Sequence, residues 1–300
     1  MIKNFETYKQ FLVDSGKSER TILGYLADIT IFSRWFEQTH GEILCPDNLT
    51  PTDVREYKQH LLTIQKAKAT TINRHLAALR SYAAWAKTNG SAVYNPADGI
   101  KGVSQQKHAP KWLDRKEQAA VLREAERRIQ AAKTEPAKRQ AIRDYCILGV
   151  LLNTGLRVSE LVTLEIEDIT FSERKGELRV RAGKGTKERI IPLNDSCRKA
   201  IKVWFSVRPA GKANRVFTTQ RGFATTRAIQ TVLESIGEAA HVENMTPHVA
   251  RHTFAKNLIN AGVSLEKVAM LLGHSSLDTT MVYTTPGMSD LDKAVRTLDG

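Results

Sequence analysis

The sequence predicts a mainly α protein with a small β-sheet, built from an all-helical N-terminal domain and a mixed α+β C-terminal domain. Apolar residues recur with helical spacing through residues 1–102. A later stretch alternates apolar and polar residues on both sides of G-K-G-T, which is typical of a β-hairpin. Between these regions, residues 103–112 lose the apolar period and predict a linker. A chain of 300 residues is long enough to bury two cores.

The chain is strongly basic, with a formal net charge of +13. Such an excess indicates an acidic partner, most often nucleic acid, although charge alone leaves a ribosomal or membrane-surface role open. The cysteines, Cys45, Cys146 and Cys197, are an odd and scattered set, which predicts no disulfide framework and fits a reducing compartment. No apolar signal core and no uninterrupted apolar run of about eighteen residues occurs, so we expect a soluble, cytoplasmic, nucleoid-associated protein.

Residues 1–102 contain four stretches with the spacing of amphipathic helices and no strand signal. Each stretch is bounded by residues that favour helix starts or stops. These boundary residues are Gly16, Ser18, Gly41, Thr50, Pro51, Thr70 or Thr71, and Asn89–Gly90.

The fourth stretch and the residues before it carry basic and hydroxyl side chains that suit phosphate contacts along a DNA groove. For any one of these residues, a solvated basic face is an equally good interpretation. The predicted DNA-binding residues are Lys66, Lys68, Thr70, Thr71, Arg74, Arg80, Ser81 and Lys87.

After the linker, Asp114 and Glu117 form a capping-box pattern that predicts a new helix. Residues 125–143 are polar and charged, and their local structure stays open. An apolar run from Tyr145 to Leu152 then predicts a buried helix that Gly155 ends, with Arg157 at the next turn.

Arg157 is a candidate anion-binding residue. An arginine between two packed helices is costly to bury unless it meets an anion. Pairing with Glu160, three residues further on, is the alternative, and both interpretations can hold together.

The predicted hairpin, GELRVRAGKGTKERIIPL, has Lys184 at its tip. Gly183 and Gly185 allow positive φ on both sides of this lysine and let it reach into a neighbouring groove. A lysine at a hairpin tip is more often simply solvated. Further helical stretches are expected around Trp204 and over residues 228–239.

Three short helices with polar groups aimed at one place are predicted from Thr246 to Tyr283. Thr246 can cap the first helix, with Pro247 at its first position. His248 and Arg251 lie three residues apart on its first turn, where free backbone N–H groups and the helix dipole favour an anion.

Two further polar groups follow in the same stretch. Gly273 ends the second helix and presents His274, and Ser276 can cap a last helix with Tyr283 near its end. Taken singly, Tyr283 is more often a half-buried core aromatic and His274 a satisfied loop residue. A cationic cradle together with a tyrosine indicates attack on a phosphodiester.

A metal site is the competing interpretation of this stretch. His248 and His252 have the i, i+4 spacing of a metal pair, but Arg251 lies between them, and a cation beside a metal is unfavourable. We therefore expect no metal and no other cofactor.

Five motifs in this order resemble the tyrosine recombinase (phage integrase) family, and most closely its compact Xer-type members. They are TGLRVSEL, GKGTKERIIPL, the H-x-x-R of TPHVARHTFA, LLGHSS and the trailing VYT. The likeness is strongest over residues 113–285, and residues 1–102 are similar to the family's helical core-binding (SAM-like) domain. The resemblance implies a two-domain clamp around duplex DNA, with a catalytic domain over residues 113–287.

The resemblance also implies the site residues and their chemistry. The two arginines would stabilise the pentacoordinate phosphate. The first histidine would take or relay the phenolic proton, the lysine would protonate the leaving 5′ oxygen, and the last histidine would donate a hydrogen bond to the phosphate. The product would be a 3′-phosphotyrosine, formed without metal or ATP. The activating set is Arg157, Lys184, His248, Arg251 and His274, and the nucleophile is Tyr283.

The implied partners are double-stranded DNA with inverted half-sites and three further protomers, either identical or from a sister recombinase, acting through a Holliday junction. Residues 288–300 predict a short helix with an apolar stripe, which we expect to dock on the neighbouring protomer rather than on its own chain.

Two other functions stay open. A type IB topoisomerase-like enzyme would share the chemistry, and a non-catalytic DNA-binding protein would share the scaffold. Within recombination, dimer resolution, cointegrate resolution and element integration are alternatives. The chain leaves no room for an arm-binding domain ahead of the first helix, which disfavours an integrase that uses distant arm sites.

Overall fold

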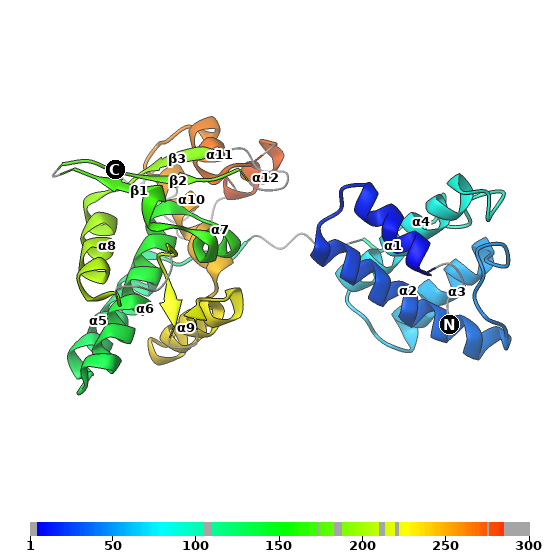
Figure 1. The fold of residues 1–300 in the computed structure, drawn as a ribbon, viewed down its shortest axis with the longest axis horizontal. Helices are drawn as coiled ribbons and strands as arrows, with labels where there is room; N and C mark the ends of the chain where they lie inside the picture. The colour runs from blue at the N-terminus through cyan, green and yellow to red at the C-terminus, as the bar shows by residue number, and fades with distance from the viewer. Residues whose placement is uncertain are drawn as a thin grey trace, which may run out of the picture. The chain divides into compact units, whose positions relative to one another are not determined.

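The computed structural model describes residues 5–104, 110–172, 174–182, 188–209, 214–219, 222–274 and 276–284. The chain divides into two compact units, residues 1–107 and 108–300. Helices predominate and the sheets are small, so the predicted fold class is confirmed (Figure 1). Within the described residues, no helix has both the length and the apolar character needed to cross a membrane.

The N-terminal unit is helical, as predicted. Ser18 caps the second helix by accepting a hydrogen bond from Thr21 N, and Gly41 ends it with a φ of 71°. Thr50 and Asp53 form a complete capping box at the third. The fourth begins slightly earlier than predicted, after Lys68. The helices are α1 (Phe5–Asp14), α2 (Glu19–His40), α3 (Pro51–Thr63) and α4 (Ala69–Thr88).

Aromatic side chains form much of this unit's core. The rings of Tyr8 and Tyr82 meet edge to face at 5.2 Å, and those of Phe32 and Tyr57 at 4.8 Å. Such geometry adds about 0.5–1.5 kcal/mol per pair beyond the area buried. Buried residues of all four helices belong to one apolar cluster.

The C-terminal unit packs helices around a small sheet. In the three-stranded antiparallel sheet, β2 lies between β1 and β3, with Leu178 opposite Ile169 and Ile191. The strands are β1 (Ile169–Phe171), β2 (Gly176–Val180), β3 (Arg189–Pro192), β4 (Thr218–Thr219) and β5 (Gly222–Phe223). The helices are α5 (Arg115–Ala131), α6 (Glu135–Thr154), α7 (Val158–Thr163), α8 (Asp195–Val207), α9 (Thr226–Ala239), α10 (Pro247–Asn260), α11 (Leu265–Leu272) and α12 (Asp278–Met281), with 3-10 turns η1 (Ile166–Asp168) and η2 (Val282–Thr284).

Helix α6 is the centre of this unit, because α5, α8, α9 and α10 all pack against it (Figure 1). It begins at Glu135, well before the predicted start at Tyr145. The first half of α6 was not predicted from the sequence because its outer face is polar. Its start signals are nevertheless present, since Thr134 caps it and Pro136 lies in its first turn. The tightly packed second half fixes the position of Gly155 and the residues that follow.

Four further expectations have different outcomes. The strands of the predicted hairpin are confirmed as β2 and β3. The tip with Lys184 and the tail over residues 288–300 lie outside the described residues. Helix α12 begins after Leu277, whose side chain forms no cap, and a cap by Ser276 stays a prediction.

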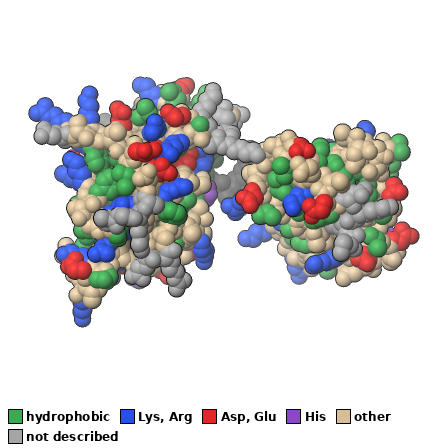
Figure 2. Space-filling model, in the orientation of Figure 1, with side chains coloured by type: hydrophobic (Ala, Val, Ile, Leu, Met, Phe, Trp, Pro, Cys, Tyr) green, Lys and Arg blue, Asp and Glu red, His purple; other side chains and the backbone are tan. Residues whose placement is uncertain are grey.

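Surface charge is distributed broadly. Figure 2 shows Lys and Arg side chains over the visible face of both units, with acidic side chains among them. The excess of cations in the sequence is therefore not gathered into a single patch on that face.

Candidate active site

The site begins at a tight turn after α6. Gly155 has a φ of 61°, in the left-handed region that favours glycine. A Cβ at this position would lie 2.4 Å from Phe254 Cδ1 and 2.8 Å from Leu272 Cδ2. The turn therefore needs glycine for its backbone angle and for the close approach of two other helices. It delivers Arg157 to the start of α7.

Arg157 is both paired and accessible. Its Nη1 donates to Glu160 Oε1 at 3.1 Å, and its backbone N–H donates to Glu160 Oε2 at 2.8 Å. Its Nη2 donates to the carbonyl of Gly273 at 3.3 Å. A third of the side chain stays exposed. The two interpretations of this arginine, pairing with Glu160 and availability to an anion, thus hold together.

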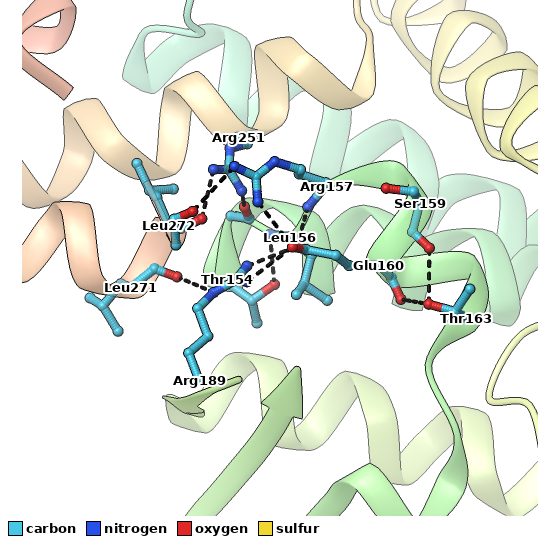
Figure 3. Close-up of polar contacts among 12 residues, drawn as sticks. Thr154, Leu156, Arg157, Ser159, Glu160, Thr163, Arg189, Arg251, Leu271 and Leu272 are labelled. Carbon is cyan, nitrogen blue, oxygen red and sulfur yellow. Dashed lines mark hydrogen bonds and ion pairs between the residues drawn. The ribbon is translucent and has the colours of Figure 1, made fainter. Parts of the chain in front are cut away.

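Arg251 lies beside Arg157 but is buried, with 4% of its surface exposed (Figure 3). Its Nη1 donates to the carbonyl of Gly155 at 2.6 Å, and its Nη2 to that of Leu272 at 2.7 Å. Burial, together with the charge of Arg157, lowers the pKa of Arg251 to about 10. It therefore stays charged near pH 7 in an environment of low polarity, where a fixed cation acts strongly.

A third arginine, Arg189, joins the cluster from the first position of β3 (Figure 3). Its Nη1 and Nη2 donate to the two oxygens of Glu160 at 2.9 and 2.8 Å. Its Nε donates to the carbonyl of Leu271 at 2.8 Å. Arg189 was not predicted from the sequence as a site residue, although a signal existed. In an alternating strand Arg189 shares its face with buried Ile191, and an inward arginine needs a partner.

Tyr283 lies in η2 with its ring in a small apolar cluster and only 2% of its surface exposed. Its hydroxyl lies 2.8 Å from Nδ1 of His252 on α10. Burial raises the pKa of Tyr283, and the charges of Arg251 and Arg157 oppose that rise. The phenol is thus held next to a base and within the field of two guanidinium groups.

His252, rather than His248, meets the phenol. His248 is exposed in the first turn of α10, and the centres of the two imidazole rings are 6.4 Å apart. Burial, together with the charges of His248 and Arg251, lowers the pKa of His252 to about 4. A neutral imidazole at pH 7 retains one ring nitrogen as an acceptor. From the sequence, His252 was a candidate only for a metal pair, because its hydrogen-bond partner lies 31 residues away.

His274 completes the group. It follows Gly273, which has a φ of 65° and ends α11. Its Nδ1 lies 2.7 Å from the Thr280 hydroxyl, and its ring stacks with that of Tyr283 at 6.4 Å. Burial, with the charges of Arg251 and Arg157, lowers the pKa of His274 to about 4. The imidazole is therefore neutral at pH 7.

Among the six predicted catalytic residues, Arg157, Arg251, His274 and Tyr283 are brought into one cluster. His248 lies at its exposed edge, and Lys184 lies outside the described residues. A hollow of about 480 Å³ opens beside Arg157 and Glu160. Three further arginines line it, together with two acidic residues. They are Arg179, Arg181, Arg215, Glu165 and Asp168.

The two arginines among the predicted DNA-binding residues have partners inside the N-terminal unit. Arg74 donates to Asp28, and Arg80 donates to the carbonyl of Ile100. The side chain of Arg74 is still half exposed. Thr71 and Ser81 are partly exposed, and Lys66, Lys68, Thr70 and Lys87 are exposed.

In the described part of the chain, one group of three side chains could hold a metal ion. It consists of His40, Asp53 and Glu56 in the N-terminal unit, far in sequence from the cluster just described. Asp53 already serves the capping box of α3, and its Oδ1 lies 3.2 Å from His40 Nε2. These contacts of Asp53 explain the grouping of acidic and histidine side chains as part of the start of α3.

Comparison with known proteins assigns the fold and the family. Residues 119–289, more than half of the chain, match the phage integrase family, and residues 5–90 match the phage integrase N-terminal SAM-like domain. The chain has the same fold as the XerH site-specific recombinase in its crystal structure bound to palindromic difH substrate, a post-cleavage complex. The TM-score is 0.75 at 21% identity, covering 93% of this chain and 80% of that chain.

Two relatives are similar over nearly their whole length. Tyrosine recombinase XerC of Staphylococcus aureus strain USA300/TCH1516 is 32% identical, covering 94% of this chain and 91% of the relative. Tyrosine recombinase XerC of Chlorobaculum parvum is 30% identical, covering 89% and 85%. The chain belongs to the phage integrase family and is a tyrosine recombinase that acts in site-specific DNA recombination.

Proposed function

We propose that Tyr283 attacks a DNA phosphodiester and forms a 3′-phosphotyrosine. In this step a bond forms between the phenolic oxygen and phosphorus, and the bond from phosphorus to the 5′ oxygen breaks. The phenol loses a proton and the leaving 5′ oxygen gains one. The proposal rests on one observation. The Tyr283 hydroxyl is hydrogen-bonded to His252, the residue that directly follows Arg251.

The two arginines supply the charge that the transition state needs. A phosphodiester is negatively charged, and attack by an oxygen adds charge to its non-bridging oxygens. Arg157 is accessible enough to meet these oxygens directly. Arg251, fixed by two backbone carbonyls, provides a preorganised positive field behind it.

Proton removal falls to the histidine pair on α10. A phenol with an ordinary pKa of about 10 needs a base at neutral pH, and the raised pKa of Tyr283 increases that need. We assign this role to His248 acting with His252, because His252 holds the hydroxyl and His248 opens to solvent. His274 donates a hydrogen bond to the phosphate.

Lys184 is the proposed acid for the leaving 5′ oxygen. With the arginines and this lysine neutralising the phosphate, the step requires no divalent metal. Because the phosphotyrosine retains the bond energy, a 5′-hydroxyl from a second duplex reverses the step without ATP. Two rounds through a Holliday junction exchange both strands, which requires four protomers on inverted half-sites. The predicted helix over residues 288–300 would link neighbouring protomers.

Covalent trapping tests the proposal. Wild-type protein and Tyr283→Phe are incubated in EDTA with a pool of nicked duplexes that have randomised centres. Denaturing gels detect adducts, and sequencing of the attached DNA identifies the half-site. We expect an adduct with the wild type alone, since phenylalanine lacks the attacking oxygen. Binding to the recovered half-site should be nearly equal for both proteins.

Two outcomes would contradict the proposal. An adduct that persists in Tyr283→Phe would assign the nucleophile to another residue. Sequence-selective binding by the wild type without any adduct would favour a non-catalytic DNA-binding protein. Lys184→Ala provides a separate check of the acid, because a 5′-thio leaving group should restore its cleavage.

A further inference from the structure

Three successive carbonyls at the end of α11 each accept a hydrogen bond from a different arginine. Figure 3 labels Leu271 and Leu272, which provide the first two. The carbonyl of Leu271 accepts from Arg189, that of Leu272 from Arg251 and that of Gly273 from Arg157. The last carbonyls of a helix lack partners within it and carry the negative end of its dipole. The end of α11 therefore gathers three guanidinium groups that would otherwise repel one another.

Arg189, like Arg251, is buried, whereas Arg157 reaches solvent. Its side chain is 8% exposed, against a third for Arg157. Each of its three nitrogens donates one hydrogen bond, Nη1 and Nη2 to Glu160 and Nε to the carbonyl of Leu271. Because the side chain is buried and fixed on these groups, we expect it to contribute to the reaction through the groups that it holds.

Glu160 connects Arg189 to Arg157. Each oxygen of this carboxylate accepts one bond from Arg189 and one from Arg157. Removing Arg189 would leave Glu160 free to rotate toward Arg157 and draw its guanidinium away from the phosphate. The packing also matches this role, since a Cβ on Gly273 would lie 2.8 Å from Arg189 Nη1.

We infer that Arg189 is a positioning residue for strand cleavage, which orients Arg157 through their shared carboxylate, Glu160. The inference rests on the proposed function, because it needs Arg157 to bind the scissile phosphate. A misplacement of about 1 Å at such a group can slow a reaction by about 100-fold. The fork geometry matters as well as the charge, because lysine cannot bind a carboxylate through two parallel bonds.

The test uses Arg189→Lys and two versions of the half-site. One has an ordinary scissile phosphodiester, and the other has a methylphosphonate, in which a methyl group replaces one charged oxygen. Single-turnover cleavage is measured on both, with the thermal midpoint as a measure of folding. We expect a loss of about 10–100-fold on the phosphodiester and little change on the methylphosphonate, because the neutral phosphorus needs less help from Arg157.

Arg143→Lys is the matched control. Arg143 is also buried, bonds a carboxylate, Asp144, through two nitrogens, and donates to a carbonyl, that of Thr218. It lies on α6 about three turns before Thr154, away from the arginine cluster. Arg143→Lys should lower the thermal midpoint by about as much as Arg189→Lys does. It should leave the ratio of the cleavage rates on the two substrates at the wild-type value.

The outcomes are separable. Equal losses on the two substrates, or no loss on either, would show that Arg189 does not act through phosphate charge, and the inference would be wrong. If Arg189→Lys does not fold, Arg189→Gln repeats the comparison. Failure of both variants to fold would make Arg189 a purely structural residue. Absence of cleavage by the wild type would instead contradict the proposed function.

Discussion

Each unit of the protein holds an arginine beside a buried carboxylate, and the two clusters are built differently. In the C-terminal unit, Glu160 receives bonds from two arginines and one backbone N–H, so both of its oxygens are satisfied. In the N-terminal unit, Asp28 is 2% exposed. Its Oδ1 meets Arg74 and lies 3.5 Å from His75, while its Oδ2 has no hydrogen-bond partner.

The difference appears in the two acid groups. Burial raises the pKa of Glu160, but the hydrogen bonds from Arg189 and Arg157 outweigh burial and hold the pKa below its ordinary value. Burial also raises the pKa of Asp28, and there His75 and Arg74 fail to reverse it. A buried carboxylate becomes a firm anchor only when its lone pairs are filled. Glu160 meets that condition and Asp28 does not.

Glu160→Gln should have the largest effect. It leaves Arg157 and Arg189 without their shared anion, and breaking a buried pair destabilises a protein by about 3–5 kcal/mol. We expect about 3 kcal/mol, because the third of Arg157 that is exposed can be hydrated. Urea unfolding measures the loss, and covalent trapping should show cleavage slowed by about 100-fold or more. An unchanged unfolding free energy would show that the anchor contributes no stability.

Asp28→Asn should behave in the opposite way. Because the folded pKa of Asp28 is raised, its ionised form is less favourable in the native protein than in the unfolded chain. The substitution removes that penalty, and Arg74, half exposed, can be hydrated without its partner. We expect stability at pH 7 to lie within about 1 kcal/mol of the wild type or above it. A loss as large as that of Glu160→Gln would show that the two clusters are equivalent.

The pH dependence of stability should separate the clusters further. The contribution of Asp28 is fully present below its unfolded pKa, near 3.8, and is lost as pH rises through the raised folded value. That of Glu160 has the other sign, being present above about 4.5 and lost as pH falls through the lowered folded value. Urea unfolding from pH 3 upward, compared between the wild type and each variant, measures both.

His75 in the N-terminal unit also contributes to the pH dependence of stability. Burial lowers the pKa of His75, and Asp28 partly opposes the shift. The contribution of His75 is therefore present above its ordinary pKa of 6.5 and is lost at lower pH. Asp28→Asn removes the opposing carboxylate, so His75 should titrate at still lower pH, and NMR of its ring protons measures the change. A pKa of His75 that rises in this variant would contradict the assigned contact.

The same contrast explains how much the sequence could predict. The helices of the N-terminal unit were predictable because each carries its own signals, such as Ser18 before α2 and Gly41 after it. Arg157 and Tyr283 were found because they lie in recognisable motifs. Arg189 and His252 were missed as site residues because their partners lie 29 and 31 residues away. Local patterns show which residues point inward, but tertiary packing decides what they meet there.

The smallest expected effect concerns DNA binding by Arg74, whose side chain is more exposed than that of Arg157. If Arg74 contacts one phosphate, Arg74→Gln should reduce the salt slope of half-site binding by about 1. Asp28→Asn should leave that slope unchanged, because the arginine keeps its charge and is already half exposed. Fluorescence anisotropy over a range of salt measures both slopes, with Lys9→Gln on α1 as the control for a lysine outside the predicted contacts.

Either slope could contradict this view. A wild-type slope in Arg74→Gln would mean that Arg74 serves only the interior of its own unit. A reduced slope in Asp28→Asn would mean that the carboxylate directs the arginine toward DNA, as Glu160 is inferred to direct Arg157. In that case a carboxylate with an unfilled lone pair would still suffice as an anchor, and the raised pKa of Asp28 would make binding by this unit sensitive to pH.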